Sequence, residues 1–140
     1  MRQVSLPALV ALIVACAVSA VVFAAVQGAI ALLIVPVLSG LDASSRTGVH
    51  GVIAMAGVLG SLIAAAVLCL PVGWLGPKHS LVFGAIVGVI GSIMIARISP
   101  PLAATDSFFL GLHWLEVTAF VGGCVLFSIV GAFGARRVAA

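Results

Sequence analysis

Two histidines, one glutamate and one arginine are the residues of this chain whose types and positions suggest chemistry. His50 and His113 each stand near the start of a long apolar stretch. Glu116 follows His113 by three residues, which places both on one face of a helix. Arg97 ends another apolar stretch. Ionisable side chains at the boundary of a membrane, or inside it, are costly and often functional, so these four residues form a candidate polar site.

Four interpretations of this site are open from the sequence. Arg97 could pair with Glu116 while the histidines face lipid headgroups, which would make the site structural. Imidazole and carboxylate groups that exchange protons could instead form a proton- or ion-linked transport site. His50 and His113 could also bind a b-type haem from neighbouring helices. A bare metal site has little support because His113-x-x-Glu116 occurs once and supplies too few ligands, so we predict no metal and no obligatory cofactor.

The composition predicts that the chain lies in a membrane. Of its 140 residues, 64% are hydrophobic and 6% are charged, and the mean hydropathy is +1.46. Soluble domains carry about 25% charged residues. Backbone in lipid must satisfy its own hydrogen bonds, and the apolar stretches lack the alternation that is typical of barrel strands. We therefore predict membrane-spanning helices.

The predicted fold is all-α, with four transmembrane helices in a bundle that forms a single transmembrane domain over residues 1–140. A hydrocarbon core about 30 Å thick is crossed by about 20 apolar residues, and the charged residues delimit the spans. The predicted spans are approximately 6–36, 50–70, 80–98 and 113–134. The first is longer than a bilayer needs, so we expect it to tilt or to bend near Gln27-Gly28. Apolar sequence continues to Leu41, which favours an uncleaved first helix over a signal peptide.

The basic residues predict the orientation of the chain in the membrane. With four spans, both termini and the middle loop share one side, and this side carries four of the six basic residues. The four are Arg2, Lys78, Arg136 and Arg137, and the two on the other side are Arg46 and Arg97. Basic residues accumulate on the cytoplasmic side, so we expect both termini in the cytoplasm, in a bacterial inner membrane. No basic cluster typical of nucleic-acid binding is present.

Small residues recur at intervals of four in every span and predict where helices pack. Helices in lipid associate through close contact between small residues. The strongest pattern is Gly84-x-x-x-Gly88, followed by Ser92. The other predicted packing residues are Ala20, Ala24, Gly28 and Gly60. These faces would pack either within the bundle or against a second copy of the chain.

A weak internal repeat relates the two halves of the chain. The second span follows Pro36, Asp42 and Gly48-Val49-His50. The fourth span follows Pro101, Asp106 and Gly111-Leu112-His113, in the same order and at nearly equal spacing. A genuine repeat would make the chain two tandem hairpins related by an axis along the membrane normal, as in some transporters. Because glycine is abundant in this sequence, coincidence is the alternative explanation.

Two further features lie inside the predicted spans. Gln27 is the one strongly polar side chain deep in the first span, and either an interhelical hydrogen bond or a role in a transport pathway would explain it. The three cysteines have no spacing that is typical of metal or redox motifs. They are Cys16, Cys69 and Cys124, and we interpret them as small buried apolar residues.

The sequence favours a non-enzymatic membrane protein without identifying a specific role. It contains no Ser-His-Asp constellation, HExxH motif or nucleotide-binding loop, so hydrolases and ATPases lose their usual support. The leading hypothesis is an accessory or interaction subunit that packs in the lipid bilayer with itself or with a larger complex. The alternative is a small oligomeric transporter or channel that uses His50, His113 and Glu116. The third hypothesis is a b-type haem electron carrier.

Overall fold

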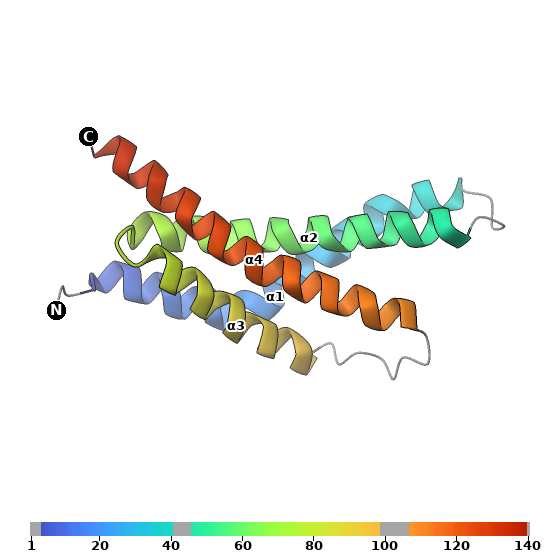
Figure 1. Cartoon of the computed structure of the whole chain (residues 1–140), viewed down its shortest axis with the longest axis horizontal. Helices are drawn as coiled ribbons and strands as arrows, with labels where there is room; N and C mark the ends of the chain where they lie inside the picture. Colours follow the sequence, from blue (N-terminus) through green and yellow to red (C-terminus); the bar gives the residue numbers. More distant parts are fainter. Residues whose placement is uncertain (1–3, 41–45, 99–106, 140) are drawn as a thin grey trace.

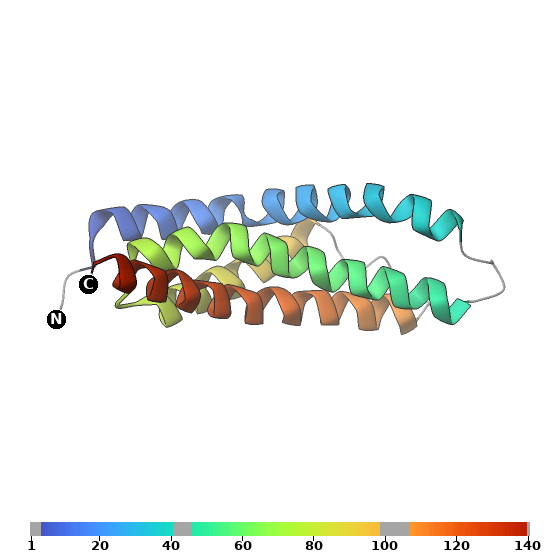
Figure 2. The ribbon, with the colours of Figure 1, turned by 90° about the horizontal axis from the view of Figure 1, so that it is seen from above.

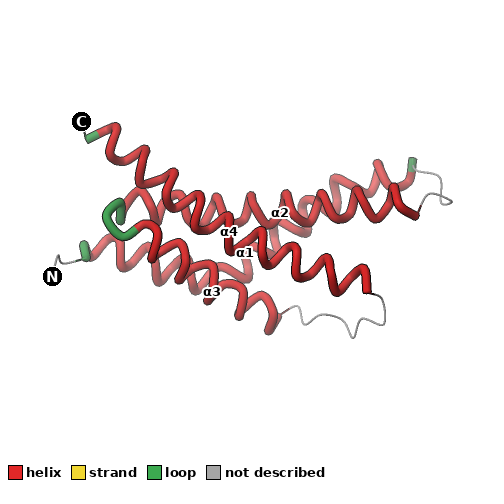
Figure 3. The backbone as a smooth tube through the Cα atoms, in the orientation of Figure 1, coloured by secondary structure: helices red, strands yellow, loops and turns green. Residues whose placement is uncertain are grey.

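The computed structural model describes residues 4–40, 46–98 and 107–139, and these residues fold into four helices (Figures 1 and 3). The helices are α1 (Leu6–Ser39), α2 (Arg46–Leu75), α3 (Ser80–Ile98) and α4 (Ser107–Val138). Each is long and apolar enough to cross a membrane, and no strand occurs in the described part of the chain. The predicted all-α fold with four transmembrane helices is therefore confirmed.

Three of the helices extend beyond the membrane spans that the sequence predicts. α1 continues through Pro36, α2 begins before His50 and continues through Pro71, and α4 begins before His113. A span ends where polar residues begin, whereas the hydrogen bonds of the helix continue past that point. Proline has no N–H donor and disfavours further helix, and α1 and α2 both end within about one turn of their proline.

The four helices alternate in direction, so that α2 and α4 run the same way. The most extensive contact is between α2 and α4, and α2 also packs against α1 and α3. The first half of α1 packs against the later part of α3, where Ser19 lies beside Gly91 and Met94, and the C-terminal half of α1 lies along α2 (Figures 1 and 2). α1 and α4 are diagonal neighbours, but Phe23 and Phe120 meet edge to face between them, with ring centroids 5.6 Å apart.

Glycines bring the backbones of α2 and α4 together in the half of the bundle nearest the α2–α3 turn. A Cβ atom added to Gly73 would fall on the backbone of Ser128. A Cβ atom added to Gly131 would fall on the carbonyl oxygen of Leu70. We call Leu70, Gly73, Ser128 and Gly131 the close-packed interface. At Gly73 and Gly131 any larger residue would collide with the backbone of the neighbouring helix.

The predicted packing glycines of α3 face α4. A Cβ atom added to Gly84 would lie 2.7 Å from the carbonyl oxygen of Cys124, and one added to Gly88 would lie 3.2 Å from the Cα of Val121. The third residue of this pattern differs, because Ser92 Oγ donates a hydrogen bond of 2.6 Å to the Gly88 carbonyl oxygen of its own helix. Gly84 and Gly88 thus set the distance between α3 and α4.

The predicted packing residues of α1 divide between the core and the surface. Ala20 is buried, as is Gly60 on α2. Ala24 and Gly28 are exposed, and a Cβ atom added to Gly28 would have nothing within 4 Å. The small-residue face of α1 is therefore packed within the chain in its first half and open in its second half.

Candidate functional site

Polar side chains from three helices meet at Gly57 of α2. Gln27 Nε2 of α1 donates hydrogen bonds to the Gly57 carbonyl oxygen at 3.0 Å and to Ser61 Oγ at 3.4 Å. Ser61 Oγ donates to the same carbonyl oxygen at 2.9 Å. From α4, the carboxyl group of Glu116 packs directly on Gly57. We call Gln27, Gly57, Ser61 and Glu116 the Gly57 cluster.

The absence of side chains on α2 makes room for this cluster. A Cβ atom added to Gly57 would fall on Glu116 Oε1, and one added to Gly60 would lie 2.6 Å from Gln27 Oε1. Gly57, Gly60 and Ser61 share one helix face because they are three and four residues apart. Two glycines and a serine therefore form a shallow recess on α2 that receives one long polar side chain from α1 and another from α4.

The Gly57 cluster lies well inside the helices. At a rise of 1.5 Å per residue, Gly57 is about 16 Å from the start of α2, and Glu116 is about 14 Å from the start of α4. Gln27 is about 18 Å from the end of α1. All three residues belong to segments that are long and apolar enough to span a membrane. An acidic side chain at this depth is costly unless it is neutral or paired.

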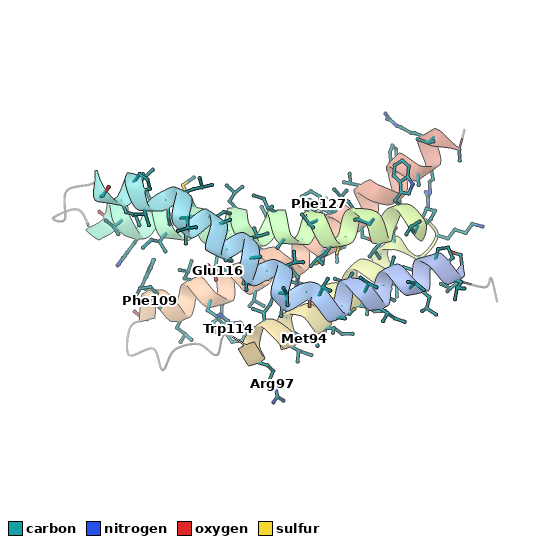
Figure 4. The ribbon with its side chains drawn as sticks, turned by 180° about the vertical axis from the view of Figure 1, so that it is seen from behind. Met94, Arg97, Phe109, Trp114, Glu116 and Phe127 are labelled. Atoms are coloured by element: carbon teal, nitrogen blue, oxygen red, sulfur yellow. The ribbon has the colours of Figure 1, made fainter. Side chains whose placement is uncertain are left out.

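Arg97 does not approach Glu116. Arg97 is exposed at the end of α3, and Figure 4 shows its side chain directed away from the bundle. Glu116 instead occupies the space between α4 and α2. Within the described residues Glu116 has no cationic partner, so the Arg97–Glu116 ion pair of the structural interpretation is not formed.

The two histidines contact aromatic rings and do not face each other. His50 stacks on Phe108 with ring centroids 3.9 Å apart and an interplanar angle of 12°. His113 meets Trp114 with ring centroids 6.2 Å apart. Phe108 precedes His113 by about 7 Å along α4, so His50 and His113 stand at different levels. Among the described residues no group of three or more His, Cys, Asp or Glu side chains could hold a metal ion.

The contacts between α2 and α4 follow a different register from the predicted repeat. The repeat equates His50 with His113, whereas the packing sets Gly57 against Glu116, a shift of about one helical turn. Three other members of the repeat, Asp42, Pro101 and Asp106, lie outside the described residues. The histidines are therefore not equivalent in their neighbours, whatever the origin of the repeat.

The three cysteines come closer together than their spacing suggests. Cys69 of α2 and Cys124 of α4 are buried in the same apolar core, and Cys16 of α1 packs against this core. All three are free thiols. They belong to the apolar core, in which Cys69 and Cys124 are fully buried.

Sequence reasoning identified Glu116 and Gln27 individually but missed their meeting point. Gly57 has no side chain, and a serine such as Ser61 can bond to its own helix, so neither was predicted as a site residue. The available signal was the run Gly57-x-x-Gly60-Ser61, which forms a small-residue face at a depth similar to that of Gln27 and Glu116. The rotation of each helix about its axis, which brings these faces together, is not visible in the sequence.

No protein-family model, curated protein or solved structure matches this chain. The function of the chain is therefore inferred from the geometry of the Gly57 cluster.

Proposed function

We propose that this chain is a small membrane transporter or channel that works through a proton- or cation-linked site at the Gly57 cluster. The observation that supports this proposal is the position of Glu116, which packs on Gly57 inside the helices and has no cationic partner among the described residues. A carboxylate in hydrocarbon is costly unless its charge is compensated, so Glu116 must carry a proton or attract a cation. Both can be exchanged, and such exchange is the basis of coupled transport.

The other groups of the Gly57 cluster suit a proton or a small hard cation. Gln27 supplies an amide oxygen next to Gly60, Ser61 supplies a hydroxyl oxygen, and Gly57 supplies a carbonyl oxygen. Hard cations prefer oxygen ligands. These neutral oxygens come from α1 and α2, whereas the charge comes from α4. A change in the protonation or occupancy of Glu116 would therefore alter contacts among three helices.

We propose that the histidines pass protons between Glu116 and one end of the bundle. His113 lies about one turn before Glu116 on α4, and His50 lies about two turns before Gly57 on α2. Both are half-buried, and both lie toward the end at which α2 and α4 begin. Imidazole groups exchange protons near neutral pH, which is the property that such a relay requires.

We also propose that both termini face the cytoplasm of a bacterial cell. α1 begins and α4 ends at the same end of the bundle as the α2–α3 turn (Figure 1). That end carries the exposed side chains of Lys78, Arg136 and Arg137, and Arg97 lies toward the other end. The accumulation of basic residues on the cytoplasmic side of membrane proteins supports this orientation.

Proton transfer across reconstituted vesicles tests the proposed function. Liposomes that contain the full chain and a pH-sensitive dye would receive a proton gradient, first with Na⁺ and then with K⁺ as the added cation. The wild-type chain should transfer protons faster than empty liposomes, and Glu116→Gln should remove the difference. Arg97→Gln is the matched control and should transfer protons as the wild type does. Equal rates for the wild type, Glu116→Gln and empty liposomes would contradict the proposal.

A second candidate function is the interaction subunit, and the exposed half of α1 favours it. Ala24 and Gly28 form a small-residue face that no residue in the described part of the chain covers. Such faces allow close approach of another helix in lipid. Gly28→Leu should therefore lower the fraction of oligomers captured by cross-linking in membranes. Gly122→Leu, at an equally open position on α4, is the control, and equal effects of the two substitutions would count against this function.

A further inference from the structure

We propose that the end of the bundle with both termini binds the phosphate headgroup of an anionic phospholipid. The site is a hollow of about 200 Å³ between the start of α1 and the turn that joins α2 to α3. The residues that line it include Val4, Ser5, Leu75, Pro77, Lys78 and His79. This hollow is separate from the Gly57 cluster and does not depend on the proposed transport function.

The turn that forms one wall of the hollow is held by hydrogen bonds on both sides. Gly76 N donates to the Val72 carbonyl oxygen at 3.0 Å, and His79 N donates to the Gly76 carbonyl oxygen at 3.0 Å. Phe83 N then donates to the His79 carbonyl oxygen at 2.9 Å and begins α3. A Cβ atom added to Gly76 would lie 2.7 Å from the ring of Phe83, so the turn fits closely against α3. The wall is therefore preorganised for a ligand.

Positive charge gathers around this turn from two parts of the chain. Lys78 belongs to the turn itself. Arg136 reaches it from α4, where its Nη2 donates a hydrogen bond of 3.1 Å to the Pro77 carbonyl oxygen. Glu116 is the one acidic residue in the described part of the chain, and it lies in the other half of α4. No described acidic group therefore opposes an anion at this end.

The hollow suits a phospholipid better than a soluble anion. Val4 and Leu75 line it, and both side chains are apolar and exposed. These side chains would face acyl chains, while the ammonium group of Lys78 and the hydroxyl group of Ser5 would face the headgroup. Basic pockets between membrane helices attract anionic headgroups, and each Lys or Arg near the surface adds about 1 kcal/mol of attraction.

Native mass spectrometry of the full chain, purified with equal amounts of phosphatidylglycerol and phosphatidylcholine, tests this proposal. The wild-type chain should retain mainly phosphatidylglycerol. Lys78→Gln and Arg136→Gln should each lower the ratio of bound phosphatidylglycerol to phosphatidylcholine about fivefold. Arg97→Gln, which removes an exposed arginine toward the opposite end, should leave the ratio unchanged.

Two further measurements make the outcome decisive. Lys78→Arg keeps the charge and should keep the lipid ratio, which would show that the loss in Lys78→Gln reflects charge and not misfolding. An unchanged ratio in both Lys78→Gln and Arg136→Gln would overturn the proposal. Displacement of the bound lipid by inorganic phosphate alone would also overturn it, because the site would then belong to a soluble anion.

Discussion

The Gly57 cluster and the close-packed interface use glycine at the contacts of α2 for opposite purposes. At Gly73 and Gly131, an added Cβ atom would strike the backbone of the neighbouring helix. At Gly57 and Gly60, it would strike the polar tip of a side chain, Glu116 or Gln27. Glycine brings the helices into direct contact in one half of the bundle, and in the other half it makes room for polar groups between them.

This difference separates a part of the molecule that is built for packing from a part that can change. Backbone atoms in contact have nowhere to move, whereas a side-chain tip can rotate away or exchange its partner. A site that gains and loses protons or cations needs the second arrangement. The close-packed interface would then hold α2 and α4 together while the Gly57 cluster changes its contacts.

The largest effect should come from filling the close-packed interface. Gly73→Val places a branched side chain against the backbone of Ser128, so we expect the free energy of unfolding to fall by about 3 kcal/mol. Denaturant titration in detergent micelles measures this change. Gly122→Val, at an exposed position with open space, is the control and should cost about 1 kcal/mol or less. Similar losses at both positions would mean that Gly73 has no special packing role.

Filling the recess of the Gly57 cluster should cost less than filling the close-packed interface. Gly57→Ala displaces the outer part of the flexible Glu116 side chain and no backbone atom, so we expect a loss of about 1 kcal/mol in the free energy of unfolding. In a Glu116→Ala background the same change should cost much less, because the displaced group is absent. A double-mutant cycle measures the coupling between the two residues. A coupling of zero would show that Glu116 does not rest on Gly57.

Removing the interhelical hydrogen bonds of Gln27 should have a similar or smaller effect. Gln27→Leu deletes the bonds to Gly57 and Ser61, and polar contacts between membrane helices are worth about 1 kcal/mol or less. Thr118→Val is the matched control, because Thr118 Oγ1 is bonded to the Trp114 carbonyl oxygen of its own helix at 2.7 Å. We expect the control to change the free energy of unfolding by less than about 0.5 kcal/mol. Equal losses would contradict an interhelical role for Gln27.

The smallest effect should come from Arg97. Arg97→Gln removes an exposed charge that has no contact with Glu116, so the free energy of unfolding should change by less than about 0.5 kcal/mol. The same substitution in a Glu116→Gln background should cost the same amount. A measurable coupling between Arg97 and Glu116 would contradict this account, because it would show that the two residues form the ion pair of the structural interpretation.

The sequence was sufficient to predict the architecture because lipid imposes simple demands. Long uncharged stretches predicted four helices, and the structure confirms them. The interhelical hydrogen bond that we considered for Gln27 is also confirmed, at Gly57 and Ser61. Helix lengths are less predictable, since α2 and α4 begin before His50 and His113, where the predicted spans start.

The site could be predicted only in part because sequence spacing indicates depth but not rotation. Arg97 and Glu116 end and begin neighbouring spans, so a pair between them was reasonable, but their side chains occupy different faces of the bundle. His50 and His113 occupy similar places in the sequence pattern. The packing of α2 on α4 nevertheless places them about one helical turn apart along the bundle. Gly57 could not be predicted as a site residue, because it contributes only the space that a side chain would otherwise fill.

The most direct test of the central claim is infrared difference spectroscopy of the Glu116 carboxyl group in reconstituted protein. Spectra would be recorded between about pH 5 and about pH 9, a range that covers the titration of many buried carboxyl groups, in Na⁺ and in K⁺. Glu116→Gln serves as the blank. We predict a carboxyl stretching band that changes with pH or with the cation, that is absent from Glu116→Gln, and that shifts in Gly57→Ala. A wild-type spectrum identical to that of Glu116→Gln under every condition would contradict the claim that Glu116 exchanges a proton or a cation.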